Sequence, residues 1–296
     1  EDWNGSSWTE VADMSVSQAD GTGAGTSAAA VAFGGASTPK AMTEEFNTGV
    51  PIGAWSTGGS LTGAARAYQY SAGTQDASFN TGGNAPSFTE GTAITEIYNG
   101  TNWTEVNDLN TAKARGGAAG TTTAGLVFGG VPGPKDETES WNGASWTQLG
   151  TLTTARAGRG QASAGTNTAT LFFGGEAPPG SSALTEIYNG TNWTEVNNLN
   201  TATYWAGCAG ASNSDAMKMG GNTAPSNNSS ATVETWNGTN WTEVADLTTA
   251  LTGTGGSGNT TAALAAGGVN TEGGGYYSTS LEWNSSSVLT KTIDTD

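Results

Sequence analysis

Several glutamates lie where a tight hairpin would bring two carboxylates face to face. If Tyr98 and Trp103 pair across a turn at Asn99-Gly100, then Glu96 opposes Glu105. The same register opposes Glu186 to Glu195 and Glu234 to Glu243. Directly opposed like charges destabilise a sheet, so we expect something to relieve them. One answer is solvent along an outer edge strand; the other is a divalent cation such as Ca²⁺, which prefers carboxylate oxygens.

A second group of side chains has the chemistry of a carbohydrate site. Tyrosine and tryptophan rings offer flat stacking surfaces, and arginine donates to hydroxyl or carboxylate oxygens. The candidate ligand-binding residues are Tyr68, Tyr70, Arg115, Arg156, Arg159, Tyr204, Trp205, Tyr276 and Tyr277. The alternative is structural, because rings near the first strand of a repeated unit can fill gaps and the arginines can pair with nearby acids.

The composition excludes most enzyme classes. The chain has no histidine, so Ser-His-Asp and Cys-His arrangements and histidine-ligated zinc or copper are impossible. The single cysteine, Cys208, excludes an internal disulfide. Two carboxylates are enough for a glycosidase, but no pair stands out when every unit has one. We therefore predict a protein that is not an enzyme and has no cofactor.

The net charge of −17 limits the partners. A surface of this sign repels phosphate backbones and anionic membrane surfaces, so we predict no nucleic-acid binding. No apolar run approaches the roughly 18–20 residues of a membrane span, and the first residues, EDWNGSSW, do not have the pattern of a signal peptide. We predict no membrane insertion.

The elements that position these side chains repeat along the chain. A Gly-Gly pair recurs every 45 to 48 residues, at 34–35, 82–83, 129–130, 174–175, 220–221 and 267–268. A short apolar run precedes most pairs, and an aromatic residue, an Asn-Gly turn and a tryptophan follow, as in EIYNGTNWTEV at 96–106. Each unit therefore predicts four strands, of which the second ends in Gly-Gly and the last two form a hairpin.

Four-stranded units of this length cannot bury an aromatic face alone but can do so side by side. The sequence predicts one all-β domain over 1–296, a β-propeller of antiparallel blades, most simply six. A seven-bladed or incomplete ring is the alternative, and a sandwich or solenoid the runner-up. We expect the N-terminal hairpin, within 1–13, to complete the last blade beside strands in 253–268, with 281–296 as an extra hairpin or tail. The reverse assignment, with 281–293 closing the blade, stays open.

The units differ on one face only. In an antiparallel meander, the turns between strands one and two and between strands three and four share a face, here called the uniform face. The loops between strands two and three and the connections to the next unit share the other, here called the variable face. Their sequences differ in every unit, whereas the uniform turns are nearly invariant. Function is usually carried by such variable loops on a constant scaffold.

The repeated Gly-Gly, aromatic and tryptophan pattern resembles the kelch repeat over nearly the whole chain. The sequence motif WNGTNWTEV, together with LNTA and FGG, is more similar still to kelch-like proteins of marine, cyanobacterial bacteriophages. The resemblance implies a virion structural protein, as a tail-fibre, appendage or capsid-decorating component, located in the virion. Its implied partners are other virion proteins or copies of itself, with host-surface glycan bound during host attachment. The alternative is a soluble glycan- or protein-binding kelch propeller, extracellular or cytoplasmic, outside any virion.

Overall fold

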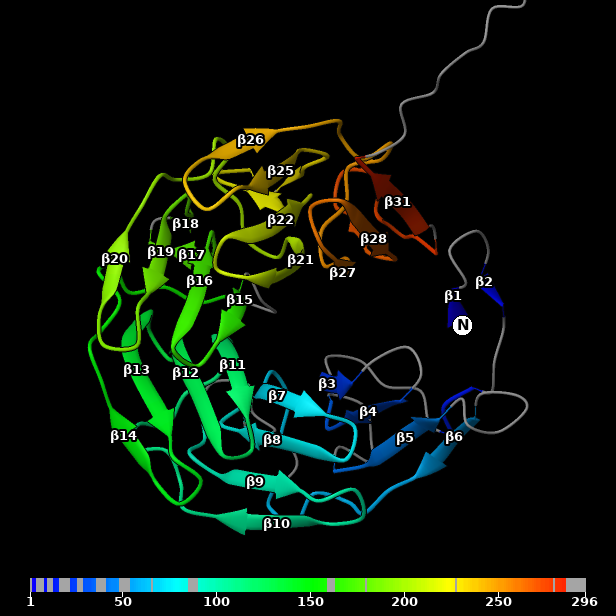
Figure 1. Ribbon diagram of the computed structural model, residues 1–296. Helices are drawn as coiled ribbons and strands as arrows, with labels where there is room; N and C mark the ends of the chain where they lie inside the picture. Colours follow the sequence, from blue (N-terminus) through cyan, green and yellow to red (C-terminus); the bar gives the residue numbers. More distant parts are fainter. Residues whose placement is uncertain are drawn as a thin grey trace, which may run out of the picture.

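The computed structural model is a ring of radial β-sheets (Figure 1). It describes residues 2–3, 8–9, 13–15, 22–25, 29–35, 41–47, 54–64, 66–84, 90–158, 163–178, 180–226, 228–278 and 280–285. All regular elements in these ranges are strands, and a search of them finds no helix that could cross a bilayer. The predicted all-β, six-bladed propeller is confirmed.

Five blades have four described strands each, and the sixth has three. The first blade contains β3 (Thr22–Gly25), β4 (Ala29–Phe33), β5 (Thr43–Asn47) and β6 (Ala54–Thr57). The second contains β7 (Tyr70–Thr74), β8 (Ala77–Thr81), β9 (Thr95–Tyr98) and β10 (Trp103–Val106). The third contains β11 (Gly117–Thr121), β12 (Ala124–Gly130), β13 (Lys135–Trp141) and β14 (Trp146–Gln148).

The other three blades continue the antiparallel order. The fourth contains β15 (Ser163–Thr166), β16 (Ala169–Phe173), β19 (Thr185–Tyr188) and β20 (Trp193–Glu195). The fifth contains β21 (Gly207–Ser212), β22 (Asp215–Met219), β25 (Val233–Trp236) and β26 (Trp241–Glu243). The sixth contains β27 (Gly255–Gly258), β28 (Ala262–Ala266) and β31 (Ser280–Asn284). Consecutive first strands contact one another from β3 to β27, as their small residues allow.

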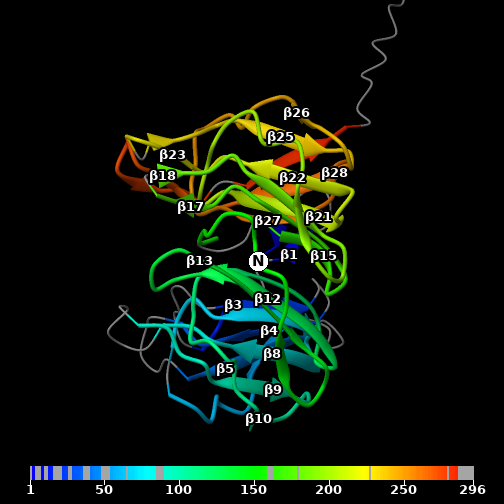
Figure 2. The same cartoon turned by 90° about the vertical axis from the view of Figure 1, so that its left-hand side faces the viewer.

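Short hairpins extend the loops between the second and third strands of the last three blades. They are β17–β18 (Glu176–Ala177 and Gly180–Ser181), β23–β24 (Asn222–Thr223 and Asn228–Ser229) and β29–β30 (Val269–Asn270 and Gly275–Tyr276). Figure 2 shows β17, β18 and β23 together on one side of the ring. Isolated bridges such as Ala114 with Val131 join these loops to the connections between blades, so both lie on the variable face.

The N-terminal hairpin does not supply the third strand of the last blade. Its strands β1 (Asp2–Trp3) and β2 (Trp8–Thr9) pair with each other, and β31 pairs with β28 instead. Figure 1 places β1–β2 between the sixth and first blades. This corrects our expectation for the third strand. The β29–β30 hairpin returns the chain directly to β28, where Trp283 donates to the Thr260 carbonyl, as Trp236 donates to Asn213 in the fifth blade.

The Gly-Gly pairs are required where a second strand passes close to the neighbouring connection. Gly129 and Gly130 have φ angles of 64° and 120°. A Cβ on Gly130 would lie 2.2 Å from the Tyr70 hydroxyl and 2.4 Å from the Ala114 carbonyl oxygen. A side chain there would therefore collide as well as strain the backbone.

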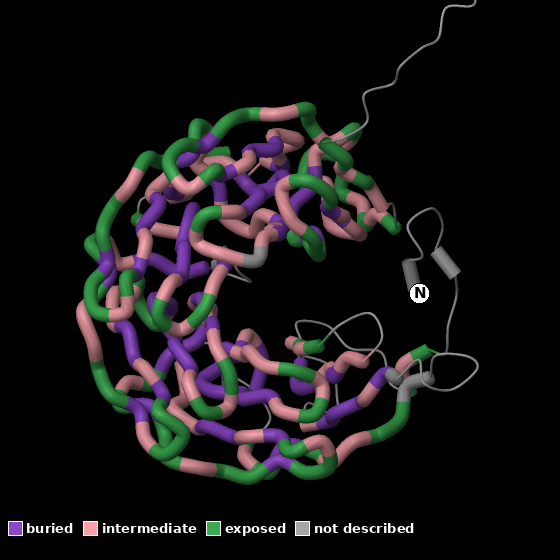
Figure 3. The backbone as a smooth tube through the Cα atoms, in the orientation of Figure 1, coloured by how far each residue is buried: buried purple, intermediate pink, exposed green. Residues whose placement is uncertain are grey.

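The core lies in the wedges between blades, and Figure 3 shows the buried stretches inside the ring wall. In the four wedges from the first blade to the fifth, a fourth-strand tryptophan packs on a second-strand phenylalanine of the preceding blade, as Trp193 does on Phe128 with ring centroids 4.8 Å apart. Its Nε1–H also donates to the threonine that lies three residues before the aromatic residue of the third strand of that blade. The pairs are Trp103–Thr43, Trp146–Thr95, Trp193–Thr138 and Trp241–Thr185, at 2.7 to 2.9 Å.

Candidate binding site on the variable face

Three bulky residues occupy the same position in three connections between blades. Tyr68, Arg115 and Trp205 follow the bridged residues Ala67, Ala114 and Tyr204, and their φ angles are 56°, 61° and 58°. They are the non-glycine residues with positive φ in the described ranges. A side chain in this left-handed region costs on the order of 1–3 kcal/mol, and such strain clusters at functional sites.

Backbone hydrogen bonds link this position from blade to blade. The Arg115 N–H donates to the Tyr68 carbonyl at 3.1 Å, and the Gly158 N–H donates to the Arg115 carbonyl at 2.7 Å. Further round, the Gly253 N–H donates to the Trp205 carbonyl at 2.8 Å. These bonds link the connections in two runs, Tyr68–Arg115–Gly158 and Trp205–Gly253, and the side chains lie on this inner rim of the variable face.

The side chains of the rim group in two pairs. The Arg115 guanidinium carbon lies 4.6 Å from the Tyr68 ring centroid, which is a cation–π geometry. The rings of Tyr204 and Trp205 are 6.2 Å apart and tilted by 34°. All four side chains are half-buried. Tyr204 and Trp205 also line a cavity of about 10 Å³, which is water-sized.

Two of the predicted ligand-binding residues are in the core instead. The Tyr70 side chain is buried and its hydroxyl donates to the Gly129 carbonyl at 2.7 Å. Burial raises the pKa of Tyr70 well above its usual value. Arg156 is also buried, against Glu186 and over the Phe172 ring. Neither offers a surface to a ligand in this structure, which corrects the expectation for both.

The remaining predicted residues lie elsewhere or outside the described part. Tyr276 ends the β29–β30 hairpin and is exposed, and Tyr277, the next residue, is half-buried. Arg159 lies outside the described residues. The rim residues Tyr68, Arg115, Tyr204 and Trp205 are thus the predicted set that the structure gathers on one inner edge.

The opposed glutamates pair as predicted, and the partner of the inner carboxylate differs from both expectations. Glu96 faces Glu105, Glu186 faces Glu195 and Glu234 faces Glu243. In each pair the first carboxylate is buried and the second is exposed. Buried cations relieve the repulsion, and the ion pairs of the second, fourth and fifth blades are Arg66–Glu96, Arg156–Glu186 and Lys218–Glu234.

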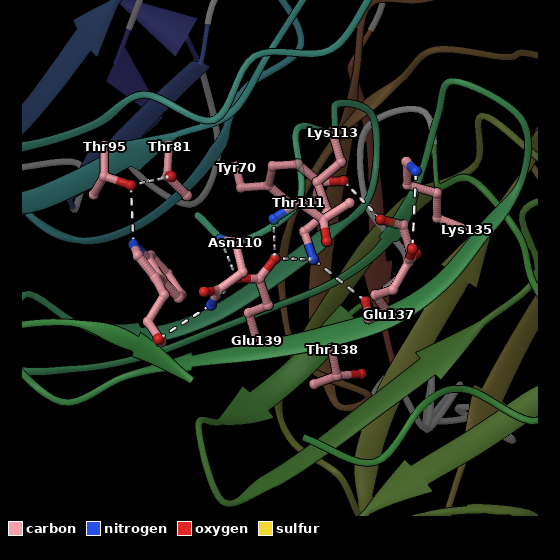
Figure 4. Close-up of polar contacts among 12 residues, drawn as sticks. Tyr70, Thr81, Thr95, Asn110, Thr111, Lys113, Lys135, Glu137, Thr138 and Glu139 are labelled. Atoms are coloured by element: carbon pink, nitrogen blue, oxygen red, sulfur yellow. Dashed lines mark hydrogen bonds and ion pairs between the residues drawn. The ribbon is translucent and has the colours of Figure 1, made fainter. Parts of the chain in front are cut away.

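Glu139 shows how the connection itself completes this arrangement (Figure 4). Its carboxylate accepts from the backbone N–H groups of Asn110 and Thr111 at 2.7 and 3.2 Å, and from the Asn110 side chain. The Lys113 ammonium lies 3.2 Å away. Burial lowers the pKa of Lys113, and the attraction of Glu139 opposes that shift. The carboxylate therefore fixes the connection that enters its blade.

The described residues give no support to the hypothesis of a calcium site at the opposed glutamates. The inner carboxylates already bind cations and backbone donors, and the described ranges contain no group of three histidine, cysteine, aspartate or glutamate side chains placed to hold a metal. The alternative that the arginines pair with nearby acids is confirmed for Arg156, whereas the role of Arg66, Lys113 and Lys218 as partners of the opposed glutamates was not predicted. Two features of the sequence indicate the ion pairs: a glutamate two residues before the aromatic residue of each of these hairpins, and the basic residue that ends NTAK (110–113) and TTAR (153–156) in the preceding connection.

A scan against protein-family models and a search of curated proteins both find no match to this sequence. Among solved structures, the chain is similar to the one titled "Structure of YjhT", with a TM-score of 0.72 and 16% identity. The match covers 93% of this chain and 97% of that chain. At this identity the likeness shows the fold alone, which is that of a six-bladed β-propeller.

Proposed function

We propose that this chain is a non-catalytic structural and binding module whose variable face binds carbohydrate. We further propose that it is a virion component, of a tail fibre, appendage or capsid decoration, that contacts host-surface glycan. The observation that carries the binding proposal is the strained, left-handed backbone of Tyr68, Arg115 and Trp205 on one rim. The virion role is supported by the resemblance of the repeats to kelch-like phage proteins.

The strain at the rim supports a functional reason for the large side chains. In the connection to the sixth blade the corresponding residue is Gly253, with φ of 66°, so the fold is compatible with glycine here. A Cβ on Gly253 would meet no atom within 4 Å, so the position faces open space. Large residues at this position therefore cost stability without being needed to fill the core.

The chemistry of the rim suits a sugar. Aromatic faces pack against the C–H groups of a pyranose, and a guanidinium donates to hydroxyl or carboxylate oxygens in a fixed plane. Neighbouring loop hairpins are also tied together, because the Ala224 N–H donates to the Ser181 hydroxyl and the Ser229 N–H to Thr271, both at 2.9 Å. Rigid loops of this kind reduce the entropy that binding must overcome.

The non-catalytic assignment rests on what the ionisable groups do. The sequence has no histidine, and the buried carboxylates Glu96, Glu139, Glu186 and Glu234 are held by cations and backbone donors at the blade junctions. These groups stabilise the ring, which leaves them unsuited to proton transfer with a substrate.

Binding is tested by glycan-array screening followed by titration calorimetry with Trp205→Gly and Arg115→Gly. Both variants should lose most of the binding, while Thr191→Ala on the uniform face should retain it. Trp205→Gly should also be about 1 kcal/mol more stable to unfolding than Trp205→Ala, because glycine relieves the positive φ. Folding and binding are thereby separated. Undiminished binding by both glycine variants would refute the proposed face.

The virion assignment is tested separately by imaging and mass spectrometry of particles whose genome encodes this chain. Symmetric density of the ring on the particle is the expected result. Absence of the chain from purified particles, with glycan binding intact, would favour the soluble propeller and remove the structural role.

A further inference from the structure

The junction between the fifth and sixth blades contains a cavity of about 150 Å³. Its inner wall is apolar, because the buried side chains of Met217, Met219 and Val233 line it from the fifth blade. The half-buried side chains of Leu281 and Trp283 line it from the sixth. A cavity of this volume is large enough to hold a benzene ring.

The mouth of the cavity is polar. Its other lining residues are 245–248 of the connection and Glu282 of β31. Asp246, Thr248 and Glu282 are exposed, so they mark the side on which the cavity meets solvent. Within the described residues, neither carboxylate has a hydrogen bond or an ion pair. The space for a ring is thus bordered by two acidic side chains that have no partner of this kind there.

The preceding junction shows which group fills such a space. There the Trp241 ring packs on Phe173 with ring centroids 4.8 Å apart and on Trp236 at 5.4 Å. At the cavity, Met219 corresponds to Phe173, since each precedes a Gly-Gly pair, and Trp283 corresponds to Trp236. The cavity is therefore the counterpart of the space that an indole ring fills one blade earlier.

One exchange in the sequence defines the kind of ring. In the four earlier junctions a tryptophan Nε1–H donates to the threonine three residues before the third-strand aromatic residue, as Trp241 donates to Thr185 at 2.9 Å. At the cavity the corresponding residue is Val233, whose side chain accepts no hydrogen bond. A buried N–H without an acceptor is costly, so the ring that suits this cavity is a hydrocarbon ring.

We propose that this cavity binds an arylalkylammonium ion, with its hydrocarbon ring inside and its ammonium group between Asp246 and Glu282. The thioethers of Met217 and Met219 make favourable contacts with the edge of such a ring. The ammonium stays at the solvent-facing mouth, so binding does not remove its charge from water. The site is separate from the rim and does not depend on the carbohydrate binding proposed for it.

The test uses 2-phenylethylammonium as the probe and 2-phenylethanol as its neutral counterpart of similar shape. The full chain has four methionines, so the methyl signals of methionine report on the cavity in a simple NMR spectrum. Met217→Leu and Met219→Leu assign the two signals. We expect both to move when the ammonium is added, whereas the signal of Met42, in the first blade, stays in place. At about 0.15 M NaCl the ammonium should bind about tenfold more tightly than the alcohol.

The charge requirement is tested with Asp246→Asn combined with Glu282→Gln. This variant should lose the preference for the ammonium and bind the alcohol as before. Glu105→Gln combined with Glu195→Gln is the matched control, because it removes two exposed negative charges from other blades and should keep the preference. Met217 and Met219 signals that respond to neither probe, or to both probes equally, would overturn the proposal. A preference that the control variant also loses would overturn it as well.

Discussion

Lys218 reaches its carboxylate from a different element than the other buried cations. Arg66, Lys113 and Arg156 come from the connection that enters the blade, whereas Lys218 lies on β22 directly opposite Glu234. The connection residue that corresponds to Arg156 is Thr203, which donates no charge. In the sixth blade the cation and carboxylate positions hold Leu251 and Leu281. The same pair of positions therefore holds an ion pair of either of two kinds or two leucines, depending on the blade. This is expected if a well-packed apolar pair can replace a buried ion pair.

Moving the cation back to the connection should restore stability. Lys218→Phe alone leaves the Glu234 carboxylate buried without its cation and should cost about 3–5 kcal/mol in the free energy of unfolding. Adding Thr203→Arg recreates the fourth-blade arrangement, in which Arg156 stacks over Phe172 at 4.3 Å beside Glu186, and should recover most of the loss. Denaturant unfolding of both variants, with Thr203→Arg alone as control, measures this. No recovery in the double variant would contradict the equivalence of the two positions.

The buried Lys218 also predicts a pH dependence. Burial lowers its pKa from 10.5 to about 8, with Glu234 opposing the shift. Between about pH 8 and pH 10 the unfolded chain then binds more protons than the folded chain, so the unfolding free energy rises with pH. Relative to Lys218→Met, the native sequence should gain about 2 kcal/mol from pH 7 to pH 10. Parallel pH dependences of the two proteins, measured by denaturant unfolding, would contradict this assignment.

The candidate site was predictable only in part at this scale. The variable face and the residues Tyr68, Arg115, Tyr204 and Trp205 were predicted because these residues differ among otherwise similar connections, whereas their grouping in two pairs comes from the structure. Tyr70 and Arg156 have the same residue types but lie two residues after Tyr68 and one before Ala157, where the chain enters the core. Residue type alone does not distinguish the rim from the core. Tyr68 and Tyr70 are two residues apart, and the left-handed backbone at Tyr68 is what separates a rim position from a core position.

At the scale of elements, the Trp–Thr hydrogen bond joins neighbouring blades. The Trp193 Nε1–H donates to the Thr138 hydroxyl at 2.7 Å, in a buried wedge. Thr138→Val keeps the shape and leaves this donor without a partner, so unfolding should become easier by about 1–3 kcal/mol. Thr104→Val, on the exposed face of β10, should change stability by less than about 0.5 kcal/mol. Equal thermal shifts for the two variants would show that the hydrogen bond contributes nothing.

The repeated elements themselves were well predicted. The Asn-Gly turns and the alternation around Tyr98 and Trp103 fix the register of the outer hairpins, because a hairpin register follows from its turn. The third strand of the last blade was not, since the Trp3 unit has the full pattern of tryptophan, Asn-Gly turn and tryptophan, whereas the Trp283 unit, which pairs with β28, lacks the second tryptophan. Local pattern cannot say which copy reaches β28; the short β29–β30 hairpin decides it.

At the scale of the molecule, the charge is more one-sided than the composition suggests. Four of the nine basic residues, Arg66, Lys113, Arg156 and Lys218, are buried in ion pairs, whereas Glu105, Glu195 and Glu243 are exposed. Surface self-repulsion should destabilise the ring at low salt. Raising NaCl from about 0.01 M to about 0.15 M shortens the Debye length from about 30 to about 8 Å and should raise Tm. Replacing the three exposed glutamates with glutamine should shrink that rise; an unchanged salt response would exclude self-repulsion as its cause.

The direction of the Trp–Thr hydrogen bonds has a consequence for synthesis on the ribosome. Each of the four wedges from the first blade to the fifth is closed by a tryptophan that is translated 51 to 60 residues after its threonine. A nascent chain therefore finishes one joint as each new unit emerges, and only its most recent unit presents unsealed apolar surface. In this order the hairpin at 96–106 packs against its own neighbouring blade before the identical hairpin at 186–196 has been synthesised. Mispairing between the two copies is therefore limited.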